Sequence, residues 1–262
     1  MTVGSFTRYV ALGDSQTEGV GDGDDVTGLR GWADRLAAQI ALVNPGLQYA
    51  NLAVRGKLAW QIRAQQLDAA LALEPDLVTV LAGMNDLLRP RFDPDEVVGH
   101  VEAMFAAFAG TGAVVATLTF PDVGRLIPMA RAVRGRVAAV NERVRAAAAR
   151  YGVIVAEAAQ HAVVADPRLW SPDRLHASPL GHQRIADALA EALGLPGSDD
   201  TWTRPIMPAL PERNVLQAIA AEVQWAGVAL VPWAMNRVQG RSSGDHRVAK
   251  RPFPLPVDGL PV

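Results

Sequence analysis

The sequence predicts a three-layer α/β domain in which helices cover both faces of a five-stranded parallel sheet. Short apolar runs rich in Val and Leu alternate with longer helical stretches from Tyr9 to about Leu195. Half of the 262 residues are hydrophobic and a fifth are charged, which suits a sheet buried on both faces. Strand–helix alternation of this kind implies right-handed crossovers between parallel strands.

The expected strands are short and end at Gly, Pro or Asp, as buried strands tend to. They cover Tyr9–Leu12, Leu47–Ala53, Leu77–Leu81, Ala113–Leu118 and Gly152–Val155. Helices are expected near Leu29–Leu42, Leu58–Leu73, Pro94–Ala109, Ala130–Arg150 and Pro179–Leu193. Ser178 and Pro179 suit the N-cap and first-turn positions of the last helix, because a serine hydroxyl accepts from a free N–H and proline needs no donor there.

The composition of the sequence changes after Leu195. Residues 196–262 hold nine of the 18 prolines and contain no obvious strand. We therefore expect an α/β domain over residues 1–195 and a helical and irregular C-terminal extension over residues 196–262. Within the extension, an amphipathic helix is expected over about 212–231, and a basic, Pro-rich tail follows it.

The helix at about 212–231 is apolar enough to raise the question of a membrane. Glu222, two glutamines on the opposite face and Pro232 argue against a membrane span. We expect the helix to dock on the core or on a partner subunit, and contact with a membrane surface is the second interpretation. The oligomeric state stays open.

Composition excludes several classes of function. The formal net charge is -2, so the chain has no global basic field to hold nucleic acid, and no nucleic-acid partner is expected. The sequence has no cysteine, which excludes disulfides, thiolate metal sites, iron–sulfur clusters and a cysteine nucleophile. Residues 1–10 do not have the pattern of a secretory signal, so a cytoplasmic protein is expected.

Four polar clusters lie where open parallel sheets form their sites, at the carboxyl ends of strands. They are GDSQTEG (Gly13–Gly19), NLAVRG (Asn51–Gly56), GMND (Gly83–Asp86) and SPDRLH (Ser171–His176). The first three follow the first three strands, and the fourth comes just before the last helix. We therefore expect all four clusters to meet at one edge of the sheet.

These clusters supply the groups that acyl transfer needs. Ser15 is the candidate nucleophile, and a serine hydroxyl needs an adjacent base to remove its proton. His176 is the candidate base, because neutral imidazole accepts a proton near pH 7 and returns it to a leaving group. Asp173 is placed to accept the other ring N–H of His176 and fix its tautomer. The backbone N–H groups of Ser15 and Gly56 and the side-chain amide of Asn85 are candidate donors to the tetrahedral oxyanion.

In order and spacing, across roughly residues 8–195, the four clusters resemble the signature blocks of the SGNH (GDSL-type) hydrolase family. The resemblance implies a flavodoxin-like sheet of strand order 2-1-3-4-5 and esterase or lipase-type hydrolysis of small-molecule acyl esters without a metal or other cofactor. It implies a triad of Ser15, Asp173 and His176 and an oxyanion hole of Ser15, Gly56 and Asn85. Stretches such as GWADRLA and DPRLWSPDRLH are similar to an actinobacterial branch of the family. One departure is Gln16, where the family often has a hydrophobic residue.

Other residues near the clusters have supporting or structural interpretations. Asp14 is expected to bond backbone amides of neighbouring loops, and Asp86 to support the loop of Asn85. Candidates for lining the substrate pocket are Gln16, Trp32, Arg55, Lys57 and Trp60. Of these, Trp32 fits better as packing between helix and sheet, and Arg55 and Lys57 suit surface salt bridges as well as an anionic substrate group. His182 is expected to have a surface or packing role, and Gly19–Asp25 to form a flexible loop.

Two other classes of function stay open. A metal-dependent phosphoesterase is the first, because GDS, GMND and a late histidine superficially resemble dinuclear metal motifs, although five histidines supply few ligands. A catalytically silent binding or membrane-associated protein on the same fold is the second. For an esterase the natural substrate also stays open, because specificity lies in loops that vary.

Overall fold

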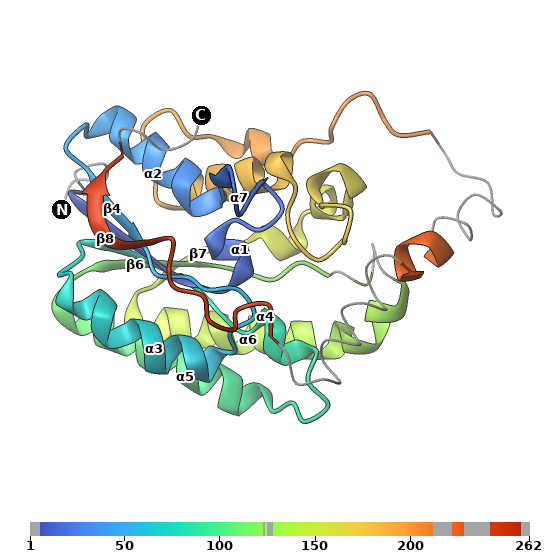
Figure 1. Ribbon diagram of the computed structural model, residues 1–262, viewed down its shortest axis with the longest axis horizontal. Coiled ribbons are helices and arrows are strands. Elements are labelled where there is room, and N and C mark those ends of the chain that lie inside the picture. Colours follow the sequence, from blue (N-terminus) through green and yellow to red (C-terminus); the bar gives the residue numbers. More distant parts are fainter. Residues whose placement is uncertain (1–5, 123, 125–127, 212–221, 228–241, 258–262) are drawn as a thin grey trace.

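The main sheet has six strands in the order β7-β6-β5-β1-β4-β8 (Figure 1). The computed structural model describes residues 6–122, 124, 128–211, 222–227 and 242–257. The strands are β1 (Arg8–Gly13), β4 (Gln48–Asn51), β5 (Leu77–Leu81), β6 (Val114–Leu118), β7 (Ile154–Ala156) and β8 (Arg251–Pro256). The first five are parallel, and β8 is antiparallel to β4. Among the parallel strands the order is 2-1-3-4-5, which confirms the expected fold class.

β1 is the strand that places the first polar cluster at the middle of the sheet edge. Tyr9 pairs with Tyr49 of β4 and with Leu77 of β5, and β1 is buried from Tyr9 onward. Two-sided burial of this kind explains why the strand is a continuous apolar run. Two short helices, α1 (Ser15–Glu18) and α4 (Met84–Leu87), follow β1 and β5. The polar clusters of β1, β4 and β5 therefore begin side by side.

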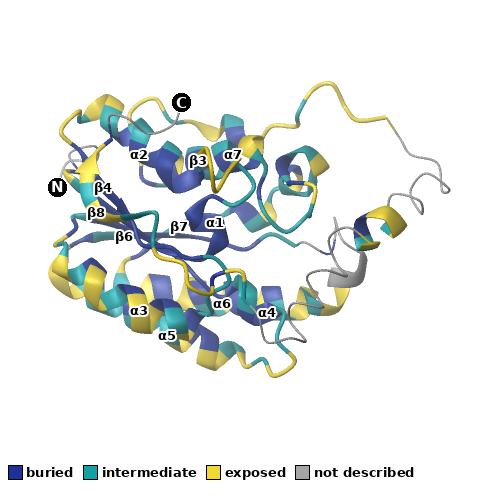
Figure 2. Ribbon diagram, viewed as in Figure 1, coloured by how far each residue is buried: buried dark blue, intermediate teal, exposed yellow. Residues whose placement is uncertain are grey.

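Longer helices form a layer on each face of the sheet (Figure 1). α2 (Trp32–Val43) and α7 (Pro179–Ala192) cover one face, and α3 (Ala59–Ala72), α5 (Pro94–Thr111) and α6 (Arg134–Tyr151) cover the other. Figure 2 shows the parallel strands largely buried between helices whose outer faces are exposed, whereas β8 at the sheet edge is largely exposed. The connections contain the 3₁₀ helices η2 (Pro128–Val133), η3 (Ala158–Gln160), η4 (Ala162–Ala165), η5 (Pro167–Leu169) and η6 (Asp200–Thr203). As predicted, the Ser178 hydroxyl caps α7, accepting from the Gly181 N–H at 3.1 Å.

A small hairpin occupies the segment after α1, where the sequence predicts a loop. It consists of β2 (Gly23–Asp24) and β3 (Gly28–Leu29), which are antiparallel. The Asp24 carboxylate closes the turn by accepting from the N–H groups of Val26 and Thr27 at 2.8 and 2.7 Å. Aspartate is common in such turns because its side chain bonds the backbone just ahead of it.

β8 corrects the expectation that the extension contains no strand. The strand has proline at positions 252, 254 and 256, so the missing N–H groups all lie along one edge. The residues between them keep their N–H groups for pairing with β4. Proline in a strand is tolerated only at a sheet edge, which is where β8 lies. Strong anchors offset its poor strand propensity, since Arg251 donates to the carbonyl oxygen of Tyr49 at 2.8 Å.

The rest of the extension is described in part. The predicted helix at 212–231 lies outside the described residues except for 222–227, which are helical. Trp202 of η6 and Val257 after β8 both belong to the hydrophobic core, so the extension packs against the α/β domain at both of its described ends. No helix within the described ranges is long and apolar enough to cross a membrane.

Candidate active site

The other three polar clusters are all joined by hydrogen bonds to one segment of the first, Asp14–Glu18. Asn85 donates its side-chain amide to the Asp14 carboxylate at 3.0 Å. The Arg55 N–H donates to the Glu18 carboxylate at 2.7 Å, and the Gln16 amide donates to the carbonyl oxygen of Leu175 at 2.7 Å. The structure therefore brings the predicted site residues to one edge of the sheet, as expected from the strand-end positions.

Ser15 is the first residue of α1, at a tight turn from β1. The Asp14 carboxylate caps the helix by accepting from the Gln16 N–H at 3.2 Å. The turn is crowded: a Cβ on Gly13 would lie 2.2 Å from the Thr17 hydroxyl oxygen, so only glycine fits there. Ser15 keeps 8% of its surface exposed. A nearly buried serine at a helix start has its own N–H free of helical hydrogen bonding.

Asp173 and His176 form a directly bonded pair. The Nδ1–H of His176 donates to Asp173 Oδ2 at 2.7 Å. The other oxygen, Oδ1, accepts from the Ser171 hydroxyl at 2.6 Å and from the N–H groups of Leu175 and His176 at 2.8 and 3.0 Å. Burial acts to raise the pKa of Asp173, but the hydrogen bonds and charge of His176 and the Ser171 hydroxyl hold that pKa well below its usual range. The carboxylate is therefore ionised at neutral pH and fixes the His176 ring with Nε2 available as a base.

Gln16 connects α1, which starts at Ser15, to the loop of His176. Its amide nitrogen donates to the Leu175 carbonyl oxygen at 2.7 Å, and its amide oxygen accepts from the Ala177 N–H at 3.3 Å. These two backbone groups flank His176. Sequence reasoning identified Gln16 only as a departure from the family pattern and as a pocket-lining candidate. The sequence did not show that the backbone on both sides of His176 bonds the Gln16 carboxamide.

The two further oxyanion candidates lie at the ends of β4 and β5. Gly56 has a φ of +77°, a conformation that favours glycine. The side-chain nitrogen of Asn85 bonds the Asp14 carboxylate at 3.0 Å and the carbonyl oxygen of Lys57 at 3.1 Å. Asn85 is therefore oriented by the neighbouring loop of Gly56 as well as by Asp14.

Asp14 and Asp86 are both buried supports for these loops. Burial raises the pKa of Asp14 to about 7, against the hydrogen bonds from Gln16 and Asn85 and the charge of His176, which lower it. Asp86 accepts from the Ala59 N–H at 3.0 Å and so holds the start of α3 against the loop of Asn85. Burial also raises the pKa of Asp86.

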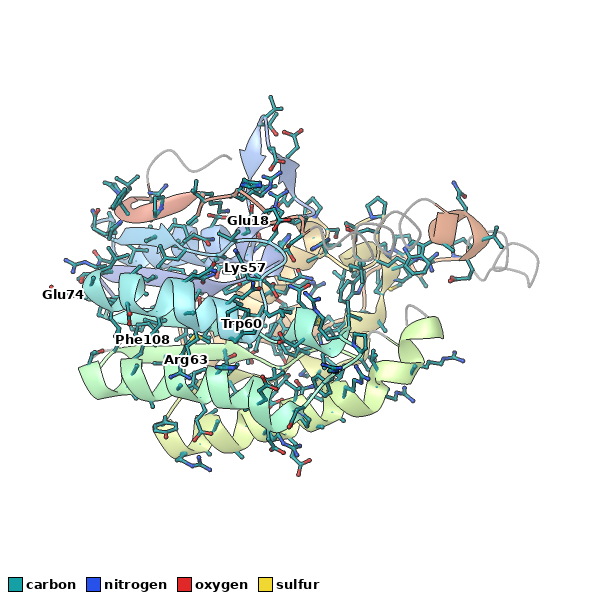
Figure 3. All side chains as sticks on the ribbon, turned by 60° about the horizontal axis from the view of Figure 1, so that its bottom comes forward. Glu18, Lys57, Trp60, Arg63, Glu74 and Phe108 are labelled. Atoms are coloured by element: carbon teal, nitrogen blue, oxygen red, sulfur yellow. The ribbon has the colours of Figure 1, made fainter. Side chains whose placement is uncertain are left out.

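Four of the pocket-lining candidates from the sequence do not border the apolar cavity described below. Trp32 is 1% exposed and belongs to the hydrophobic core, so it packs helix against sheet. Arg55 pairs with Glu18 at 2.7 Å and with Asp25 at 2.9 Å. Trp60 is exposed near the start of α3, and Lys57 lies just before that helix (Figure 3).

An apolar cavity of about 70 Å³ borders Asp14 and Gln16. Its walls come from the ends of β5 and β6, the start of α4, the loops before α7, α7 itself and η6. They include Leu81, Met84, Phe120, Trp170, Ala188 and Trp202. Gln16 is thus the one pocket-lining candidate from the sequence that lines this cavity.

His182 is a buried structural histidine. Its Nδ1 accepts from the Trp32 N–H and its Nε2–H donates to the Val20 carbonyl oxygen, both at 3.1 Å. Burial lowers its pKa to about 4, so the ring is neutral. His182 therefore holds α7 to the segment that follows α1, a packing role as expected.

The C-terminal extension touches the site at two places that sequence reasoning missed. Trp225 is buried and donates its indole N–H to the carbonyl oxygen of Asp173 at 2.9 Å. At the other place, Ser242 and Gly244 lie against the turn that contains Gly56. Among the described residues, no three His, Asp or Glu side chains are grouped so as to hold a metal ion.

Comparison with known proteins places this geometry in a family. Residues 11–184 match the GDSL-like lipase/acylhydrolase family. The fold resembles an alpha/beta hydrolase enzyme from the metagenome of Lake Arreo, Spain, at 24% identity and a TM-score of 0.60, over 72% of this chain and 95% of that one. It also resembles an acetylxylan esterase from Geobacillus stearothermophilus at 20% identity and a TM-score of 0.61, over 78% and 99% of the two chains. No curated protein matches the chain.

A third similar structure is the lipase/acylhydrolase from Enterococcus faecalis, at 20% identity and a TM-score of 0.58, over 72% of this chain and 96% of that one. These structural likenesses bear on the fold. The family match covers well over half of the chain and contains Ser15, Gly56, Asn85, Asp173 and His176. The chain therefore belongs to the GDSL-like lipase/acylhydrolase family of ester hydrolases.

Proposed function

We propose that the chain hydrolyses carboxylic esters by acyl transfer to Ser15, with His176 as the base and Asp173 as its partner. The observation that carries the proposal is the 2.7 Å bond between His176 Nδ1 and the ionised Asp173 carboxylate. It fixes the tautomer in which Nε2 has a free lone pair. The Gln16 bonds to Leu175 and Ala177 support it further, because they tie this histidine to the helix that starts at Ser15.

In the first half-reaction the Ser15 oxygen attacks the ester carbonyl carbon while His176 Nε2 takes the hydroxyl proton. The C–O bond to the alcohol then breaks, and His176 returns the proton to the departing alcohol. In the second half-reaction a water loses a proton to His176 and attacks the acyl-enzyme, which releases the carboxylic acid and restores the Ser15 hydroxyl.

The negative oxygen of each tetrahedral intermediate needs fixed donors. The N–H groups of Ser15 and Gly56 are two, and the Asn85 amide is the third. Because Asn85 already bonds Asp14 and Lys57, it has to share one N–H with the substrate oxygen. The existing bonds hold the amide in place before substrate arrives, which is the preorganisation that oxyanion stabilisation requires.

The apolar cavity beside Asp14 and Gln16 supports an apolar acyl group as the part of the substrate that the enzyme selects.

The proposal is tested by Ser15→Ala with p-nitrophenyl esters, with Ser198→Ala as the control far along the chain. Ser15→Ala is expected to abolish hydrolysis and leave the thermal transition unchanged, and Ser198→Ala to keep activity. Hydrolysis that survives Ser15→Ala would refute the assignment of the nucleophile.

A further inference from the structure

Residues 242–247 of the extension, which we call the clamp turn, pack directly on the turn that contains Gly56. They lie beyond residues 11–184, where the family match ends. Gly244 is buried there, and a Cβ added to it would lie 1.9 Å from the carbonyl oxygen of Arg55. A Cβ added to Gly56 would lie 2.4 Å from the hydroxyl oxygen of Ser242. Glycine at both positions is therefore what allows the two turns to touch.

Ionic hydrogen bonds connect the clamp turn to the nucleophile helix. Arg247 donates twice to the Asp25 carboxylate, at 2.9 and 2.6 Å. Asp25 also accepts from Arg55 at 2.9 Å, and Arg55 donates from its side chain and from its backbone N–H to Glu18 of α1. The clamp turn, the Gly56 turn and the helix that starts at Ser15 thus form one connected unit.

The clamp turn is also held by hydrogen bonds within it and by an anchor in the residues that follow it. The Asp245 carboxylate accepts from the Ser242 N–H at 2.8 Å, and Arg247 Nε donates to the carbonyl oxygen of Ser243 at 3.0 Å. Three residues later, Lys250 bonds the buried Asp34 carboxylate at 2.5 Å, and β8 follows. A turn closed by its own hydrogen bonds and followed by this anchor resists displacement from Gly56.

We infer that the clamp turn positions the Gly56 N–H for the oxyanion. The inference rests on the acyl transfer proposed above. A backbone N–H stabilises an oxyanion only when it is held at about 2.7–3.1 Å from the oxygen, and glycine is the residue whose backbone moves most freely. By covering Gly56 with Ser242 and Gly244, the extension removes that freedom and makes residues outside the α/β domain part of the catalytic geometry.

The direct test is Gly244→Ala in the full chain, compared with Gly99→Ala in α5, where an added Cβ meets nothing within 4 Å. The readouts are kcat and KM for a p-nitrophenyl ester and the Ki of a trifluoromethyl ketone, which forms a tetrahedral adduct with an active-site serine. The kinetic constants and the Ki are measured below the thermal transition of every variant. We expect Gly244→Ala to lower kcat and weaken the inhibitor in parallel by roughly 10- to 100-fold, less than the loss of a whole donor, with KM little changed. Gly99→Ala is expected to match the wild type.

Arg247→Met is the second variant, because it removes the tie to Asp25 without adding bulk to the turn. We expect it to lower kcat and inhibitor affinity together by roughly 3- to 10-fold. Wild-type values in both clamp variants would overturn the inference, and so would a loss of kcat with unchanged inhibitor affinity. Failure of the proposed function itself looks different, since the wild-type chain would then neither hydrolyse esters nor react with the ketone.

Discussion

The side chain of Gln16 holds the backbone on both sides of His176. Its amide nitrogen bonds the residue before the histidine at 2.7 Å, and its amide oxygen bonds the residue after it at 3.3 Å. Since Gln16 follows Ser15 directly, one nearly buried side chain ties the proposed nucleophile to the loop of the proposed base. The position at which the family often has a hydrophobic residue is here a polar link between the Ser15 turn and the His176 loop.

Gln16→Leu is predicted to impair catalysis more than stability. Leucine fills similar space but makes neither bond, so the His176 loop gains freedom relative to Ser15. We expect kcat to fall about tenfold, which corresponds to about 1.4 kcal/mol of lost transition-state stabilisation. Steady-state kinetics over pH 5–9 measures this, with Gln65→Leu on the exposed face of α3 as the matched control. Equal kcat values in the two variants would show that the Gln16 bonds do not position the base.

Lys250→Met is predicted to destabilise the fold through Asp34. Lys250 Nζ lies 2.5 Å from the Asp34 carboxylate, and the Asp34 side chain is only 2% exposed. Removing one partner of a buried ion pair leaves a buried charge and costs about 3 kcal/mol. Urea unfolding measures the loss. Arg204→Met is the control, because the Arg204–Asp200 pair is about two-thirds exposed on both sides and is worth less than about 1 kcal/mol. An equal loss of unfolding free energy in the two variants would contradict the conclusion that the Lys250–Asp34 pair is a buried anchor for the extension.

His182 is predicted to make stability fall as the pH drops from 6.5 to 4. Its folded-state pKa is about 4 against 6.5 for an unperturbed histidine, so between these values only the unfolded chain takes up the proton. The full effect is about 3 kcal/mol, present above pH 6.5 and lost on acidification. The contribution of Asp14 to stability changes in the opposite direction and rises as the pH falls. Its raised pKa of about 7 makes the folded chain hold a proton that the unfolded chain has lost.

Comparing the wild type with His182→Gln isolates the contribution of His182 to stability. The contribution of Asp14 is present in both proteins and cancels in the difference. Urea midpoints at pH 7 and pH 4.5 are the measurement. We expect the difference in stability between the two proteins to shrink at pH 4.5, because glutamine has no proton to gain. A difference that is the same at both pH values would contradict a neutral, buried His182.

Ala188→Leu is predicted to shift acyl-chain preference toward short esters. Ala188 is 2% exposed and lines the apolar cavity, so the added isopropyl group occupies the space proposed for the acyl chain. We expect kcat/KM for p-nitrophenyl octanoate to fall at least about tenfold, and the value for the acetate to stay within about twofold. Ala64→Leu on the surface of α3 is the control. Equal losses for acetate and octanoate would place the acyl chain elsewhere.

The parallel sheet and the meeting of the four polar clusters could be predicted because each depends on local pattern. Val- and Leu-rich runs specify buried strands, and strand ends determine where Ser15, Asn85 and Gly56 lie. β8 could not be predicted in this way, because its alternating prolines oppose strand formation and the strand depends on long-range anchors such as Lys250–Asp34. The same holds for Trp225 on the Asp173 loop and for Gly244 on the Gly56 turn, since each contact joins segments far apart in the sequence.

The central claim, a nucleophilic Ser15 activated by His176 and Asp173, is tested most directly by covalent labelling with a fluorophosphonate and mass spectrometry of the intact and digested protein. We expect a single adduct on Ser15 in the wild type and none in Ser15→Ala. We also expect labelling to be slowed in Asp173→Asn, on the order of 10⁴-fold if the loss follows that of serine-protease triads. A folded wild-type chain without an adduct on Ser15, or Asp173→Asn labelled at the wild-type rate, would contradict this claim.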